Sequence, residues 1–119
     1  GASLVFFSTV AVATGLSFHA SVSASKGAVE GLARTLAAEL AGKGVRANVI
    51  APSMTDTPLA DKFLSSEKKR EAAAGRHPLG RVGTVDDIAS MAVFLLSPES
   101  GWITGQVIGV DGGLGSVRP

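Results

Sequence analysis

Short apolar runs alternate with amphipathic segments along this chain. The first run covers residues 3–7, and a second run with β-branched residues covers 45–51 and is closed by Pro52. Runs without polar alternation are typical of strands that are buried on both faces, as in parallel sheets. A third strand is predicted over 106–110, where an Asp-Gly-Gly sequence closes it. The pattern therefore predicts three strands.

A helix is predicted from Ser23 to about Leu40. Apolar or small residues recur there at helical spacing, and Gly42 and Gly44 follow as stop signals. The residues expected on its buried face are those at positions 28, 29, 32, 33, 36 and 40.

The other helices are predicted from weaker signals. Residues 59–75 should form a polar helix or a pair of helices, and their small apolar surface favours mobility. Thr84 followed by Asp87 resembles a capping arrangement that begins a further helix, and Pro98 should end it. The segments without either periodicity are predicted to be loops: 13–21 and 52–58.

Strands and helices alternate in this order as two crossover units. Such units build a parallel sheet that helices cover, so we expect an α/β fold in one domain over 1–119. A sheet of three strands leaves both outer strands as edges. We expect the edge at 3–7 to be covered by a missing N-terminal half, a symmetry mate or a swapped element. The opening at Gly1, directly on a strand, suggests a piece of something longer.

Composition narrows the classes of function. The 119 residues are 45% hydrophobic with a mean hydropathy of +0.33, which predicts a sizeable core. The net charge is +1, the basic residues are scattered and aromatics are few, so nucleic acid is not an expected partner. The chain has no cysteine, and His19 and His77 are far apart in sequence, so no metal site is expected. No apolar run has membrane-spanning length, and a cytoplasmic location is expected.

Three spaced motifs carry a family resemblance. They are Val22-Ser-Ala-Ser-Lys-Gly-Ala-Val29, Pro78-Leu-Gly-Arg-Val-Gly83 and Ile103-Thr-Gly-Gln-Val-Ile-Gly-Val-Asp-Gly-Gly113. In this order they resemble the C-terminal half of a short-chain dehydrogenase/reductase. The resemblance implies the C-terminal half of a Rossmann-like, doubly wound parallel sheet. It also implies an ancestor that passes a hydride between NAD or NADP and a carbonyl or an alcohol.

The proton-transfer residue of that family is missing from this chain. The family has a tyrosine four residues before a lysine, which lowers the tyrosine's pKa and holds the nicotinamide ribose. Lys26 matches the lysine, but Val22 stands at the tyrosine position and the chain contains no tyrosine. The alternative reading of Val22 is a core or pocket-wall residue. Ser21, Ser23 and His19 are conceivable substitutes, although the serines point off the face of Lys26 and His19 falls in the preceding loop.

The family also has a serine that polarises the substrate carbonyl, thirteen residues before the tyrosine. By resemblance, that count falls on Thr9, with Ser8 beside it. Threonine keeps the hydroxyl that this role requires. The alternative is a strand-end hydroxyl that satisfies loop backbone.

Four residues at and after the second strand match the cofactor-facing loop of the family. They are Pro52, Ser53, Thr55 and Thr57, with Ser53 in place of the family's glycine. By resemblance, the threonines meet the nicotinamide carboxamide and the phosphates, and Lys26 holds the ribose; the alternative is an ordinary loop. The Gly-rich turn that holds the pyrophosphate in the family has no match here. We therefore expect NAD or NADP as the cofactor of the full-length family, and no tight binding of either by this chain.

Three functions stay open. The first is a fragment or a degenerate relative of an NAD(P)-dependent short-chain oxidoreductase, catalytically impaired as it stands. The second is a non-catalytic assembly module, because family members form dimers or tetramers through regions equivalent to 23–42 and 85–113. The third is a split enzyme completed by a separate N-terminal chain. The expected partner is a second copy, as a homodimer or homotetramer, or a full-length relative.

Overall fold

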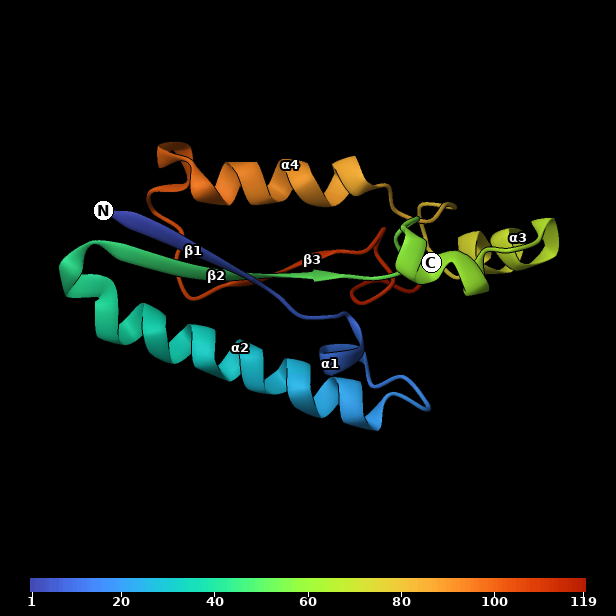
Figure 1. Cartoon of the computed structure of the whole chain (residues 1–119), viewed down its shortest axis with the longest axis horizontal. Coiled ribbons are helices and arrows are strands. Elements are labelled where there is room, and N and C mark those ends of the chain that lie inside the picture. The colour runs from blue at the N-terminus through green and yellow to red at the C-terminus, as the bar shows by residue number, and fades with distance from the viewer.

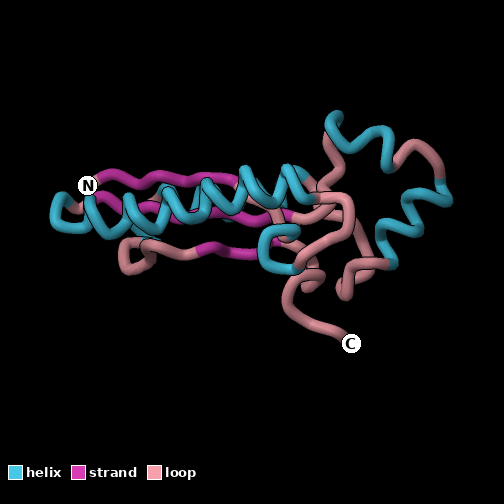
Figure 2. The backbone as a smooth tube through the Cα atoms, turned by 90° about the horizontal axis from the view of Figure 1, so that it is seen from below, coloured by secondary structure: helices cyan, strands magenta, loops and turns pink.

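The computed structural model describes residues 1–119, which form three layers (Figure 1). The middle layer is a sheet of three strands, β1 (Ala2–Phe7), β2 (Val45–Pro52) and β3 (Val107–Val110), in the spatial order β1-β2-β3. Both pairings are parallel, and the first residues of β1 and β2 lie opposite each other. β2 is the central strand, and β1 and β3 are the edges (Figure 2). The predicted α/β fold with a parallel sheet is confirmed.

Helices cover both faces of this sheet. α2 (Ala20–Leu40) and the single turn α1 (Ala11–Thr14) lie on one face, and α4 (Val85–Leu96) lies on the other (Figure 1). α3 (Glu67–Gly75) lies beyond the C-terminal ends of the strands. The short 3-10 helices are η1 (Ala41–Lys43), η2 (Pro58–Phe63) and η3 (Pro98–Ser100). None of the helices has the length and apolar character that crossing a membrane requires.

The predicted element boundaries hold to within three residues. The loop predicted over 13–21 is confined to 15–19, because α1 reaches Thr14 and α2 already begins at Ala20. The polar segment 59–75 forms η2 and α3, as the prediction of a pair of helices allows.

The buried face of α2 is displaced from the predicted one. Ala28 and Leu32 are exposed, whereas Glu30, Ala33 and Ala37 are buried. A helix on a narrow sheet contacts it with a single stripe of residues, so the outer part of a broad apolar face stays in solvent. The inner stripe of α2 therefore contains a glutamate as well as small residues.

Local signals at two helix ends are confirmed. Gly44 follows η1 with φ +72°, a left-handed conformation that glycine adopts without strain, and its N–H donates to the Ala41 carbonyl. At the start of α4, the Asp87 N–H donates to Thr84 Oγ1 at 3.2 Å, and the Thr84 N–H donates to Asp87 Oδ2 at 2.7 Å. These reciprocal bonds form the expected capping box.

The prediction of a sizeable core is wrong for this chain. Only 17 of the 119 residues are buried, and large apolar side chains such as Val93 and the fully exposed Trp102 face solvent. The outer edge of β1 has no partner strand. The radius of gyration is 15.3 Å, whereas a compact chain of this length has about 13.5 Å. Three strands make a sheet too narrow to bury the apolar faces of the helices beside it.

Two buried polar side chains, one on a strand and one just after a strand, differ in whether they have hydrogen-bond partners. The Asn48 amide on β2 donates to the Ile103 carbonyl at 3.0 Å, and its side-chain oxygen accepts from the Gln106 N–H at 3.0 Å. Asn48 therefore joins the central strand to the segment that enters β3. Ser8, just after β1, is also buried, but its hydroxyl has no hydrogen-bond partner.

We expect Asn48→Ala and Ser8→Ala to have different effects on stability. The first change removes the acceptor of the Gln106 N–H and one of the two donors to the Ile103 carbonyl, which also accepts from Arg46 Nη1. It should lower the free energy of unfolding by roughly 1–3 kcal/mol. The second removes a hydroxyl without a partner, and should leave that free energy within about 1 kcal/mol or raise it. Urea denaturation followed by circular dichroism measures both. Equal destabilisation by the two variants would contradict the hydrogen bonding described here.

Candidate functional site

The C-terminal ends of the three strands meet at one edge of the sheet. Thr9 follows β1, Ser53 follows β2 and Asp111 follows β3. The Val10 N–H donates to the Pro52 carbonyl at 3.0 Å, so the segments that leave β1 and β2 remain side by side. In open parallel sheets this edge is where ligands bind.

Lys26 reaches the same edge from α2. Its side chain is half-buried, and Nζ donates to the carbonyl of Phe7, the last residue of β1, at 3.2 Å. The structure thus brings Lys26 to the strand end that Thr9 follows. The Thr9 hydroxyl accepts from the Ala11 N–H at 3.3 Å, which is the strand-end bond of the alternative reading, and it retains its own proton for another acceptor.

The position expected for a tyrosine carries no group that can transfer a proton. Val22 lies one helical turn before the lysine and is 46% exposed, so it is not a core residue, and the alternative of a pocket-wall residue stays a prediction. The Ser23 hydroxyl donates to the Ala11 carbonyl at 3.3 Å, and Nδ1 of His19 lies 2.7 Å from the Ser17 carbonyl. Two of the conceivable substitutes are therefore engaged by backbone.

A cavity of about 300 Å³ opens beside the segment that follows β2. We call it the loop cavity. It is lined by all four residues predicted to face a cofactor, Pro52, Ser53, Thr55 and Thr57, together with Met54, Leu59, Ala60 and Phe63. The Thr55 hydroxyl donates to the Ser53 carbonyl at 3.0 Å, which stabilises the turn of this segment. The predicted loop residues are therefore brought together around one space.

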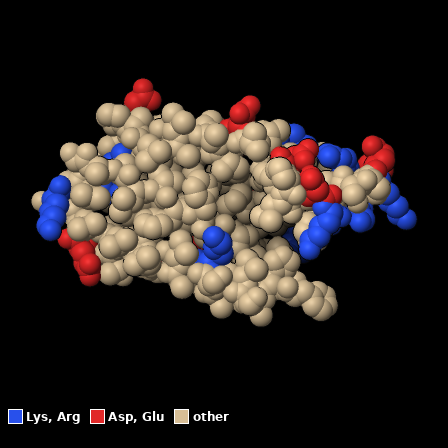
Figure 3. Space-filling model, in the orientation of Figure 1, with Lys and Arg blue, Asp and Glu red and all other residues tan.

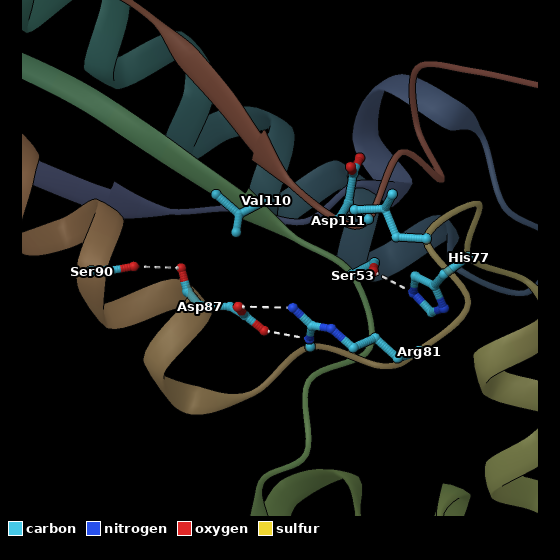
Figure 4. Close-up of a pocket in the computed structure, with 10 residues that line it drawn as sticks. Ser53, His77, Arg81, Asp87, Ser90, Val110 and Asp111 are labelled. Atoms are coloured by element: carbon cyan, nitrogen blue, oxygen red, sulfur yellow. Dashed lines mark hydrogen bonds and ion pairs between the residues drawn. The ribbon is translucent and has the colours of Figure 1, made fainter.

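A second cavity of about 140 Å³, the polar cavity, lies beside the first. Its walls come from the ends of β2 and β3, the start of α4 and the segment between α3 and α4 (Figure 4). Its lining includes Ser53, His77, Arg81, Asp87, Ser90 and Asp111. Ser53 lines both cavities.

Ser53 and His77 form a close pair between the two cavities. Ser53 Oγ lies 2.6 Å from His77 Nε2 (Figure 4), and His77 Nδ1 lies 2.7 Å from the Ala73 carbonyl. A carbonyl oxygen can only accept, so Nδ1 carries a proton, and Nε2 accepts from the Ser53 hydroxyl when it carries no proton of its own. His77 is 4% exposed. Sequence reasoning missed this residue, because a separation of 24 positions along the chain matches no recognisable motif spacing.

Arg81 and Asp87 form an ion pair on the other side of the polar cavity. Their closest atoms, Nη1 and Oδ2, are 2.7 Å apart, and a second bond joins Nη2 and Oδ1 at 3.1 Å. The hydrogen bonds from Arg81, and then those from Thr84, hold the pKa of Asp87 well below its usual range. The same pair raises the pKa of Arg81. This arrangement fixes the segment before α4 against the start of that helix.

The donor set suits one end of a dinucleotide. Lys26, Thr9 and the loop cavity offer an ammonium, hydroxyls and an open hollow at the carboxyl edge of the sheet. This is where the nicotinamide and its ribose bind in doubly wound folds. Among residues 1–119, no strand leads through a Gly-rich turn into a helix that could hold a pyrophosphate. Gly112 and Gly113 follow β3 but open no helix.

Comparisons with known proteins agree with this geometry. A family model described as enoyl-(acyl carrier protein) reductase matches residues 1–115. The 3-oxoacyl-(acyl-carrier-protein) reductase of Thermotoga maritima is 45% identical over 112 residues, which cover 94% of this chain and 45% of the relative.

Solved structures match as well. A short-chain type dehydrogenase/reductase from Mycobacterium ulcerans superposes with a TM-score of 0.91 and 37% identity over 99% of this chain and 43% of that one. A gluconate 5-dehydrogenase from Burkholderia cenocepacia, solved with NADP and tartrate, has a TM-score of 0.89 and 32% identity over 98% of this chain and 46% of that one. This chain thus spans under half the length of each of these relatives.

We expect the start of α4 to lose stability in acid through Asp87. The pKa of Asp87 in the folded chain lies below that of an unfolded aspartate, about 3.9. The ionised carboxylate therefore stabilises the fold above about pH 4. This stabilisation is lost as the pH falls through the folded pKa. Asp87→Asn should flatten the decrease of the thermal midpoint between pH 4 and pH 2. The matched control is Asp86→Asn, an exposed neighbour in the same turn. Identical pH profiles for the two variants would contradict the assignment.

Proposed function

The chain belongs to the short-chain dehydrogenase/reductase family, and on that premise we propose that it forms part of an NAD(P)-dependent oxidoreductase acting on a carbonyl or an alcohol. In this proposal its residues hold the nicotinamide end of the cofactor and the reacting oxygen of the substrate. We also propose a cytoplasmic location, since a chain without cysteine has no disulfide that would require an oxidising compartment.

The observation that carries the proposal is the meeting of Lys26, Thr9 and the loop cavity at one edge of the sheet. The Lys26 ammonium, now bonded to a strand-end carbonyl, would turn to the ribose hydroxyls. The Thr9 hydroxyl would donate to the substrate oxygen. Thr55 and Thr57 would contact the carboxamide and phosphate groups. The cofactor itself supplies or takes up the hydride.

The 119-residue chain alone should bind the cofactor only weakly. Its described residues offer donors for one end of a dinucleotide and none arranged for the pyrophosphate, so binding by this chain alone should be weaker than micromolar. A longer protein that contains these residues, or a separate chain that pairs along the open edge of β1, would complete the cofactor site.

Lys26→Ala tests this function in the longest form of the protein that contains these residues. We expect the variant to bind NADH and NADPH about 10- to 100-fold more weakly, because it loses charge-assisted hydrogen bonds worth roughly 1.5–3 kcal/mol. Titration of the cofactor's fluorescence measures the change. Lys43→Ala, in the exposed η1 at the far end of α2, is the control and should bind as the parent does. Equal affinities for parent and Lys26→Ala would refute the proposed role.

A second candidate function is assembly with another copy of the chain, and the exposed apolar residues favour it. Leu32 on α2 is 51% exposed, with Ala28 and Gly31 exposed beside it, and Val93, Leu96 and Trp102 are exposed in the 85–113 region. Small residues on a helix face permit close approach of a second helix. Charged side chains gather at the α3 end of the molecule and leave the middle of the face in Figure 3 mostly uncharged. We propose a homodimer or homotetramer through these surfaces.

Leu32→Lys should weaken this assembly. A charge in the middle of a closely packed apolar helix face must be desolvated on association, so we expect a shift from dimer or tetramer towards monomer. Sedimentation velocity over micromolar concentrations measures the shift. Ser65→Lys adds the same charge at an exposed position between η2 and α3, and should leave the mass unchanged. A monodisperse monomer at high micromolar concentration of the parent chain would overturn the assembly proposal.

A further inference from the structure

Ser53 occupies a wall that the two cavities share. It lines the loop cavity beside Pro52 and Thr55, and it lines the polar cavity beside His77 and Asp111. The residue before it is bonded to the segment that carries Thr9, through the Val10 N–H and the Pro52 carbonyl. Ser53 therefore lies between the loop cavity, where the nicotinamide end of the cofactor and the reacting oxygen beside it are proposed to bind, and a buried imidazole.

His77 is held in one orientation. Nδ1 donates to the Ala73 carbonyl in α3, and Nε2 meets Ser53 Oγ at 2.6 Å. Gly112, with φ +61°, lies against the ring, because a Cβ added there would be 3.6 Å from His77 Cδ2. The Leu79 N–H also donates to the Gly112 carbonyl at 3.0 Å, which joins the His77 segment to the residues after β3. The imidazole is thus fixed with Nε2 towards the serine.

We propose that Ser53 and His77 form a proton relay that replaces the proton transfer missing at Val22. The Ser53 hydroxyl would exchange a proton with the substrate oxygen to which Thr9 also donates, and His77 acts through Ser53 as the proton reservoir. This inference rests on the proposed oxidoreductase function, and it gives the residue at the family's glycine position a role of its own.

The relay balances in both directions. In oxidation, the substrate O–H gives its proton to Ser53 Oγ as the Ser53 proton passes to His77 Nε2, and the neutral imidazole becomes imidazolium. The electron pair of the broken O–H bond forms the carbonyl, while the substrate C–H leaves as hydride to the nicotinamide cofactor, which is reduced. In reduction, the reduced cofactor would supply a hydride to the carbonyl carbon, the serine proton would go to the substrate oxygen, and Nε2–H would return its proton to Ser53 Oγ. The Nδ1 proton stays on the ring and remains hydrogen-bonded to the Ala73 carbonyl throughout.

The charged groups around His77 leave Nε2 to the serine. Arg81 and Asp87 are paired with each other at 2.7 Å across the polar cavity. The Asp111 carboxylate accepts from the Gly113 N–H at 2.9 Å and from the Gly115 N–H at 3.1 Å. No ionised side chain therefore takes the place of Ser53 as the partner of Nε2.

Four variants test the relay in the longest form of the protein that contains these residues. The probes are a panel of simple ketones and β-keto esters with NADH or NADPH, and the corresponding alcohols with NAD or NADP. Ser53→Ala and His77→Gln should each lower kcat by about 10²- to 10⁴-fold, and His77→Gln should leave cofactor affinity unchanged. Their losses should not add in the double variant. Ser53→Thr keeps a hydroxyl and should retain most of the activity.

Ser90→Ala is the control, because Ser90 also lines the polar cavity but donates to the Asp87 carbonyl. It should keep the parent's kcat and pH profile. The pH profile of kcat in His77→Gln should differ from the parent's, because glutamine cannot exchange a proton with Ser53. Parent-like kcat and pH dependence in His77→Gln would overturn the relay.

Val22→Tyr in the His77→Gln background separates proton transfer from other causes of lost activity. A tyrosine one turn before Lys26 supplies an acid that does not need the imidazole, so it should restore turnover if the relay carries only the proton. No recovery, in a variant that still folds and binds cofactor, would count against the relay.

Nitrogen-15 NMR of the His77 ring gives a readout that is independent of turnover. We expect the Nδ1–H tautomer and an Nε2 signal that shifts in Ser53→Ala but not in Ser90→Ala. An Nε2–H tautomer, or no response to Ser53→Ala, would overturn the relay. Failure of the parent protein to bind cofactor or turn over any probe would overturn the oxidoreductase function and the relay with it. Parent activity with unaffected Ser53 and His77 variants would overturn the relay alone.

Discussion

The backbone pairing of β2 with both neighbouring strands is the interaction on which the rest of the structure depends. β2 bonds to β1 along one edge and to β3 along the other, and residues 47–50 are fully buried between the helix layers. Because the pairing is parallel, all three strands end at the same edge. This edge therefore brings together three residues that are far apart in the sequence, Thr9, Ser53 and Asp111.

The same narrow sheet explains why so little of an apolar chain is buried. Each helix layer has only three strands to cover, so Leu32, Val93 and Trp102 remain in solvent and the outer edge of β1 stays unpaired. These surfaces are where another chain or a further part of the same protein would add most stability, since apolar burial scales with the area removed from water. The fold and the proposed assembly thus follow from one geometric limit.

The chemistry at the strand ends depends on which groups can move a proton. Lys26 offers an amino group and Thr9 a hydroxyl, while the position one turn before Lys26 holds a valine. The Ser53–His77 pair brings a titratable ring within 2.6 Å of a hydroxyl on a cavity wall. A relay through this pair would let the family's hydride chemistry proceed without a tyrosine.

The sequence alone determined the alternation of strands and helices and the family, because apolar runs and spaced motifs can be seen along the chain. It also determined two helix ends, the Thr84 and Asp87 capping pair and the Gly44 stop, because these depend on neighbouring residues. It also indicated Lys26 and the loop after β2, since motif spacing carries them. It did not reveal the displaced face of α2, the thin core or the pairing of Ser53 with His77. Those features were decided by tertiary structure, because a helix's inner stripe, the width of a sheet and a contact between residues 24 positions apart depend on how distant segments pack.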